Sequence, residues 1–345
     1  MNTDQIQDQL EDYYRLTFPH HQDAQVSDLV PINEGWESII YAFKLVPDPK
    51  PESQPQNLIL RIFPGTDAHH KSQREYDGLQ VLYRVGYPVP QVVHLERDHS
   101  PFDGRPFLIM ERIDGEMLWP VLDRARPDQA AALITQFCEL FVKLHALDWH
   151  DFVPPAEQDS YHDPFIFIDR FMNMLRDALS HFPDLAAFSP VLDWLDERRD
   201  GVPCRRPAPI HWDFHPGNLI LKPDGAAVVI DWTQIQVSDP RFDLGWTLLL
   251  IGAYTTDEVR EMILSEYQRI SSASVEQLAY FDVANCVKRL GTVMISLSAG
   301  ADSMGMRPDA VAMMRRDFPA LQRVYDLMVD RTGIKVLAVE RLLDS

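Results

Sequence analysis

Cysteine is scarce in this chain, with only three among 345 residues. They stand far apart, at Cys138, Cys204 and Cys286, and no CxxC or Cys/His spacing surrounds them. A disulfide framework or a structural zinc site needs paired or clustered ligands, so the sequence indicates neither.

The chain also lacks a long apolar run. No segment approaches the roughly 20 apolar residues of a membrane span. The first 18 residues are polar and acidic, whereas a signal peptide starts with basic residues and continues with an apolar stretch. We therefore expect a cytoplasmic protein with no membrane partner.

Positively charged residues are few: the chain has 32 Lys and Arg but 52 Asp and Glu, which gives a net charge of −20. No basic cluster offsets this excess, which would repel a nucleic-acid backbone, so we expect no nucleic-acid partner. The middle of the chain is the most acidic part: residues 111–200 hold 18 acidic and 8 basic side chains.

The length of 345 residues exceeds the usual range of about 100 to 200 for one domain, which predicts two. A short helix is expected at 4–18 and another at 70–85, before Gly86 and Pro88. Short apolar segments separated by turn-forming stretches predict antiparallel strands at 27–32, 38–46, 57–63, 91–96 and 106–112. The predicted class is α+β, with a small β lobe at 1–112 and a larger helical lobe at 113–345.

Helical spacing of apolar residues dominates the second lobe. Helices are expected at 127–148, 166–180, 188–199, 241–253, 256–269, 275–299 and 307–331, and a loop at 149–165. Between them, residues 207–232 form a strand–loop–strand–strand element whose hairpin turn is at 222–225.

The most specific motif lies in that element. Asp213 and Asn218 stand five residues apart in HWDFHPGN, and Asp231 follows an apolar strand. This H-x-D-x-x-x-x-N spacing is typical of the catalytic loop of phosphotransferases. Transfer of a γ-phosphoryl group needs an acceptor hydroxyl oriented by a carboxylate, and Mg²⁺ held by hard oxygen ligands. We predict that Asp213 orients the hydroxyl and accepts its proton, while Asn218 and Asp231 are metal ligands.

These residues resemble the aminoglycoside phosphotransferase and choline kinase-like family, which has a two-lobed, protein-kinase-like fold. The family pattern is HxDxHPGN, a strand ending in IDW or IDF, and DP-x-x-DL; here these are residues 211–218, 230–232 and 239–244. The resemblance covers most of residues 27–255. It implies that the first lobe binds ATP (or GTP) with Mg²⁺, and that the second holds the catalytic loop and the site for a small-molecule hydroxyl acceptor.

The same resemblance assigns residues that contact the nucleotide. Arg61 stands where kinases carry a phosphate-binding Lys, and Glu75 is its partner in the following helix, with a solvated surface pair as the alternative. Met110, Glu111 and Ile113 resemble a kinase hinge, whose backbone meets the adenine edge; an ordinary strand end is the alternative.

The loop expected to cover the nucleotide is poor in glycine. Residues 33–38 hold one glycine, where close approach to phosphates usually uses two or three. We predict that Gly35 and Ser38 contact the nucleotide and hold it loosely. We expect His211 and His215 to bond backbone within the catalytic loop. Asp243 resembles the family position that braces this loop, although a carboxylate favoured by a helix N-terminus is the alternative.

Other functions remain as alternatives. A protein kinase shares the catalytic spacing, but here Asp231 is followed by Trp232 and Thr233 rather than Phe and Gly, and no APE motif follows. A catalytically silent kinase-like ligand-binding protein would share the fold without turnover.

Because residues 111–200 carry net −10, we expect a cationic or neutral acceptor; a solvated acidic face is the other interpretation.

Overall fold

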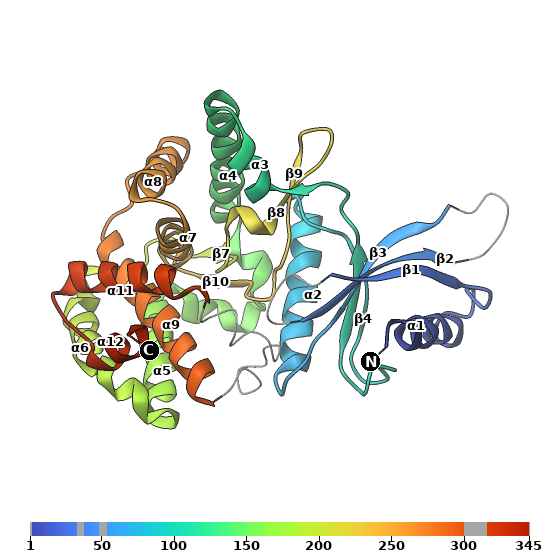
Figure 1. Ribbon diagram of the computed structural model, residues 1–345, viewed down its shortest axis with the longest axis horizontal. Coiled ribbons are helices and arrows are strands. Elements are labelled where there is room, and N and C mark those ends of the chain that lie inside the picture. Colours follow the sequence, from blue (N-terminus) through green and yellow to red (C-terminus); the bar gives the residue numbers. More distant parts are fainter. Residues whose placement is uncertain (1, 33–37, 48–53, 300–315, 345) are drawn as a thin grey trace. The chain divides into compact units, whose positions relative to one another are not determined.

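The computed structural model describes residues 2–32, 38–47, 54–299 and 316–344 (Figure 1). Its described residues divide into two compact units. One unit holds the residues up to 115 together with 220–233, and the other holds 116–219, 234–299 and 316–344. Among these residues, no helix is long and apolar enough to cross a membrane.

The first unit is built on a five-stranded sheet in which neighbouring strands are antiparallel. Its strands are β1 (Gln25–Ile32), β2 (Ile39–Val46), β3 (Gln56–Ile62), β4 (Val92–Glu96) and β5 (Phe107–Glu111), in the order β1-β2-β3-β5-β4. Two helices accompany them, α1 (Thr3–Thr17) and α2 (Ala68–Arg84). The predicted strands and helices are confirmed, with ends within two residues of the expected ones.

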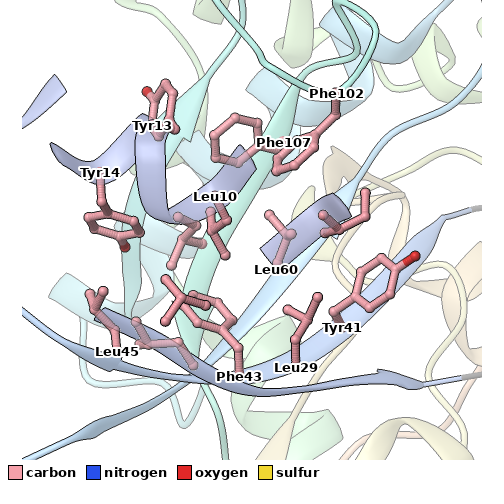
Figure 2. Packing of buried hydrophobic residues seen from close by; sticks show 14 of the residues in the cluster. Leu10, Tyr13, Tyr14, Leu29, Tyr41, Phe43, Leu45, Leu60, Phe102 and Phe107 are labelled. Carbon is pink, nitrogen blue, oxygen red and sulfur yellow. The ribbon is translucent and has the colours of Figure 1, made fainter. Parts of the chain in front are cut away.

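Successive side chains of β3 point to opposite faces of the sheet, and their contacts show that α1 and α2 lie on different faces. Leu58, Leu60 and Ile62 lie in the apolar cluster under α1, together with Tyr13, Tyr14, Phe43 and Phe107 (Figure 2). Arg61 points to the other face, where it contacts Glu75 of α2. The α1 face is therefore an apolar core, while the α2 face carries a buried charge pair.

The second unit is mainly helical. Its helices are α3 (Leu118–Arg124), α4 (Pro127–Ala146), α5 (Ile166–His181), α6 (Ser189–Arg198), α7 (Pro240–Tyr254), α8 (Asp257–Ser271), α9 (Leu278–Ala299), α11 (Phe318–Thr332) and α12 (Leu337–Leu343). Short 3-10 helices occur at Trp149–Phe152, Pro155–His162, Pro183–Phe188, Arg199–Gly201 and Pro216–Asn218, and β6 is Glu116–Met117. The α+β class predicted from the sequence is confirmed.

The expected helices from 127 to 299 all form, with ends within three residues of prediction. Helix 307–331 corresponds to α11, and its expected first part lies outside the described residues. The expectation of a plain loop at 149–165 is wrong in detail, because 3-10 turns occupy much of it. The short helices α3 and α12 were not predicted; each has seven residues, too few for a clear apolar period.

The strand–loop–strand–strand element is confirmed as β7 (Ala208–Ile210), β8 (Leu219–Leu221) and β9 (Ala227–Val229). Gly225 has a φ of 84°, which a turn of this kind requires, and the Lys222 amide donates to the Ala226 carbonyl. Strand β7 pairs antiparallel with β10 (Gln236–Ser238), so the chain returns beside the start of the loop at 211–218 just before α7.

A polar contact fastens α1 to β4. The Tyr13 hydroxyl donates to Glu96 Oε2 at 2.6 Å and lies 2.7 Å from His94 Nε2. Glu96 Oε1 accepts the backbone amides of Arg97, Asp98 and His99. Burial raises the pKa of Glu96, but the bonds from Tyr13 and these amides outweigh it and lower the pKa from 4.5 to about 2.

We predict that Glu96→Gln destabilises the protein at neutral pH by about 1–3 kcal/mol, because it removes the charge that accepts these bonds. A carboxylate whose pKa is depressed on folding stabilises above its unfolded pKa, so this contribution should fade as pH falls from about 4.5 towards 2. Urea unfolding of both proteins at several pH values measures the difference. A difference that stays constant down to pH 3 would contradict the assignment.

Candidate active site

Backbone bonds to one buried carboxylate shape the loop after β7. Asp243, fully buried in the first turns of α7, accepts the amide of His211 at Oδ2 and the amide of Trp212 at Oδ1, both at 2.7 Å. His145 Nε2 of α4 lies 3.2 Å from Oδ2. Trp212 has a φ of 59°, the left-handed region that a residue other than glycine rarely adopts. The expectation that Asp243 braces the loop is therefore confirmed.

The loop is anchored to the core through Phe214. Its ring stacks on Phe141 of α4, with centroids 4.2 Å apart and planes at 5°. Its carbonyl accepts the hydroxyl of Thr247 at 2.7 Å. Phe214 is fully buried, whereas its neighbours Asp213 and His215 are only half-buried. The loop thus presents its polar residues while its aromatic residue enters the core.

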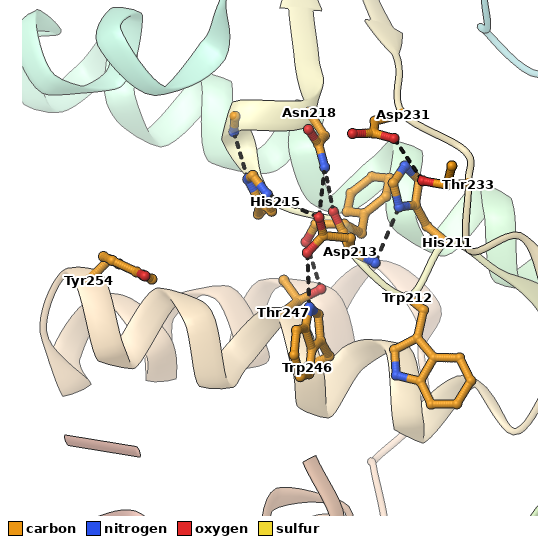
Figure 3. A network of polar contacts seen from close by, with 12 residues as sticks. His211, Trp212, Asp213, His215, Asn218, Asp231, Thr233, Trp246, Thr247 and Tyr254 are labelled. Atoms are coloured by element: carbon orange, nitrogen blue, oxygen red, sulfur yellow. Dashed lines mark hydrogen bonds and ion pairs between the residues drawn. The ribbon is translucent and has the colours of Figure 1, made fainter. Parts of the chain in front are cut away.

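Asp213 is held at both carboxylate oxygens (Figure 3). Oδ1 accepts the indole N–H of Trp246 at 2.9 Å, and Oδ2 accepts the side-chain amide of Asn218 at 3.3 Å. The same amide donates to the Asp213 carbonyl at 2.9 Å. The Asp213 side chain keeps 39% of its surface exposed, so another molecule can reach it.

Both loop histidines accept backbone amides, as expected from the sequence. His211 Nδ1 accepts from Asp213, and His215 Nδ1 accepts from Gly217. This bond places the His215 proton on Nε2, which lies 3.6 Å from Asp213 Oδ2. Burial raises the pKa of Asp213, but His215 and Trp246 outweigh it and lower the pKa below its usual range. Asp213 is therefore ionised at neutral pH.

Asp231 belongs to the other unit, where it forms an ion pair. Arg61 donates through Nη2 to Asp231 Oδ1 at 2.8 Å and through Nη1 to Glu75 Oε1 at 2.9 Å. Only 5% of the Arg61 side chain and 1% of that of Glu75 are exposed, so a solvated surface pair is excluded. Burial raises the pKa of Glu75 to about 7, against the opposing effect of Arg61. Thr233 also donates to Asp231 Oδ1, at 2.9 Å.

The oxygen donors fit Mg²⁺ chemically. The Asn218 amide nitrogen is committed to Asp213, which directs its Oδ1 away from that carboxylate (Figure 3). Asp231 adds a carboxylate. The described part of the chain contains no group of three or more His, Cys, Asp or Glu that could form a metal cage. Amide and carboxylate oxygens are each of the donor type that Mg²⁺ takes beside phosphate and water.

The expected hinge residues lie at the end of β5. Met110 is buried within the strand and Glu111 is exposed at its end. The amide of Arg112 donates to the carbonyl of Asn57, whereas no described residue accepts the amide of Ile113. Ser38 is buried just before β2, and Gly35 lies outside the described residues.

The structure brings the predicted residues together as two sets: Asp213 with Asn218, and Asp231 with Arg61 and Glu75. Trp246 contacts Asp213, and His145 contacts Asp243, which braces the loop. The sequence analysis assigned neither residue to the site. Trp246 stands three residues after Asp243, so helical spacing alone places both on one face of α7.

Known proteins resemble the chain at the level of sequence. The model of the phosphotransferase enzyme family matches residues 28–280. Acyl-CoA dehydrogenase family member 10 of Mus musculus is 26% identical over 251 residues, which are 70% of this chain and 22% of that protein. The chain thus spans only about a fifth of that relative. Aminoglycoside 3'-phosphotransferase of Streptomyces fradiae is 27% identical over 67% of this chain and 80% of its own.

Solved structures share the fold. A protein of Ralstonia eutropha, provisionally assigned as an aminoglycoside phosphotransferase, superposes with a TM-score of 0.67 over 97% of this chain and 98% of its own, at 18% identity. A mutant of aminoglycoside phosphotransferase APH(4)-Ia, in complex with AMP-PNP and hygromycin B, gives 0.60 over 94% and 99%, at 16% identity. Since the family model covers well over half of the residues, this chain belongs to the phosphotransferase enzyme family.

Proposed function

We propose that the protein transfers the γ-phosphoryl group of ATP to a hydroxyl of a small molecule. The observation that carries the proposal is the state of Asp213: an ionised carboxylate held by Trp246 and Asn218, yet exposed enough to meet an acceptor. GTP is the alternative nucleotide, since one structural relative is a complex with AMP-PNP and another, a phosphotransferase bound to kanamycin, contains GDP.

In the proposed reaction, Asp213 accepts a hydrogen bond from the acceptor hydroxyl and turns its oxygen towards the γ-phosphorus. As the new P–O bond forms, the bond between that phosphorus and the β–γ bridging oxygen breaks and ADP leaves. The hydroxyl proton passes to the Asp213 carboxylate. The role of the loop is to orient these groups, since phosphoryl transfer needs little covalent assistance.

Asn218 and Asp231 would hold Mg²⁺, which would neutralise phosphate charge when bound. Arg61 would contact the phosphates and Glu75 would hold Arg61 in place. The backbone of Glu111 and Ile113 after Met110 would meet the base, with Gly35 and Ser38 near the phosphates. The proposal assigns nucleotide binding to residues 1–112, and the catalytic loop and acceptor site to 113–345.

The first prediction concerns the metal. ATP should bind at least about tenfold more weakly without Mg²⁺, because Asn218 and Asp231 can contribute to binding only through the cation. Isothermal titration calorimetry with ATP, in Mg²⁺ and in EDTA, measures this. Equal affinities under both conditions would remove the metal assignment.

The second prediction separates two aspartates. Asp213→Ala should lower the rate of transfer by about 10² to 10⁴ and leave MgATP affinity nearly unchanged, because it removes the base and no metal ligand. Asp231→Ala should abolish transfer and also weaken MgATP binding. Calorimetry and ADP release measure both quantities.

Asp224→Ala is the matched control for these variants, since Asp224 lies exposed in the hairpin turn. It should behave as the wild type. If Asp213→Ala loses nucleotide binding while Asp231→Ala keeps it, the two roles are reversed. Full activity in both variants would reject the catalytic-loop assignment.

The third prediction concerns the acceptor, which we propose to be cationic or neutral. The net −10 of residues 111–200 would concentrate cations near the helical unit. Amino alcohols and aminoglycosides should then give higher kcat/KM than hydroxycarboxylates of similar size, and the advantage should shrink as salt screens the charge. ADP release across such a matched acceptor panel measures it, and a preference for the hydroxycarboxylates would contradict the proposal.

A further inference from the structure

Trp246 has a polar role that its burial alone would not suggest. Its side chain is mostly enclosed in the helical unit, with 8% of the residue exposed, yet its indole N–H points at Asp213 Oδ1 from 2.9 Å (Figure 3). A buried indole N–H normally finds an acceptor, and here the acceptor is the carboxylate on which the proposed transfer depends. A ring of fixed orientation therefore determines where one oxygen of that carboxylate lies.

A lysine in turn contacts this ring. The Nζ of Lys288 on α9 lies 4.3 Å from the Trp246 ring centroid and 3.9 Å from that of Trp212. An ammonium group over an indole face is attracted by the ring electrons, and the contact is stronger when it is shielded from water. Trp212 is the residue before Asp213, so one side chain of α9 contacts both the loop and α7.

We propose that Trp246 is a positioning residue for Asp213, and that Lys288 holds the Trp246 ring in the orientation this requires. The proposal rests on the proposed phosphotransferase function. Asn218 restrains Asp213 Oδ2, but its 3.3 Å contact is the longer of the two, so the Trp246 bond is the main restraint on rotation of the carboxylate. Displacement of a reacting group by about 1 Å can cost about 10² in rate.

The geometry also restricts how an acceptor binds. The indole faces of Trp212 and Trp246 are surfaces of the kind that proteins use to bind ammonium groups, but here the chain's own ammonium group covers them. A cationic acceptor would therefore place its charge away from these two rings, against carboxylates.

Trp246→Phe tests the positioning, since it keeps a smaller aromatic ring for Lys288 and removes the N–H donor. We expect kcat for ADP release from MgATP, with water as acceptor, to fall about 10- to 100-fold, while KM for MgATP changes less than about twofold. Lys288→Met should lower kcat less, and should add little in the Trp246→Phe background, because the proposal assigns the effect of Lys288 to the bond from Trp246 to Asp213 rather than to its contact with Trp212. Trp194→Phe, which removes an indole of α6, is the control and should leave kcat unchanged.

A spectroscopic measurement tests the contact without turnover. The protein has seven tryptophans, and the indole resonance of Trp246 in ¹H–¹⁵N spectra is identified by its loss in Trp246→Phe. It should shift in both Asp213→Ala and Lys288→Met, whereas the resonance of Trp194 should not. An unmoved Trp246 resonance, or additive losses in the double variant, would overturn the positioning role in an active enzyme. A wild-type protein that releases no ADP with any acceptor would instead overturn the proposed function.

Discussion

The candidate site depends on one buried side chain, the carboxylate of Asp243. A polar side chain without access to water is costly unless hydrogen-bonding partners surround it, and here the amides of His211 and Trp212 and the ring of His145 do so. To deliver two successive amides to one carboxylate, the backbone turns through the left-handed conformation of Trp212. That turn directs Asp213 towards Trp246 and Asn218. The same turn of the backbone therefore lets Asp243 brace the loop and places the proposed base, Asp213.

The other unit uses a buried arginine in the same way. Arg61 is enclosed on the α2 face of the sheet, and its two terminal nitrogens each meet a carboxylate. A lysine has a single ammonium group, whereas the planar guanidinium fork can donate to Glu75 and Asp231 in two directions at once. Asp231 itself adopts a left-handed φ of 63°. A left-handed residue thus occurs in each unit beside a hydrogen-bonded carboxylate: Trp212, whose amide donates to Asp243, and Asp231, whose side chain accepts from Arg61.

Local patterns predicted most of the fold, and they predicted part of the contacts within the candidate site. Apolar periodicity gave the five strands and the long helices, the H-x-D-x-x-x-x-N spacing linked Asp213 to Asn218, and the family resemblance linked Arg61 to Glu75. The contact of Arg61 with Asp231 spans 170 residues, so no spacing rule could reach it. Trp246 was missed for another reason: tryptophan in an apolar helix suggests core packing, and its polar edge matters only once an acceptor is known to face it. The 3-10 turns at 149–162 have too short a period to be distinguished from a loop.

These contacts also explain why family membership leaves the acceptor open. The motif residues bond mainly to one another and to backbone, so their contacts shape the loop without choosing an acceptor. The superposed structures share the fold at 14–19% identity. An acceptor, in contrast, must contact side chains outside this bonded set. Trp246 contacts Asp213 directly, and Lys288 contacts the rings of Trp246 and Trp212. A cationic acceptor of the proposed reaction would therefore meet the exposed part of Asp213 rather than the two rings that Lys288 covers.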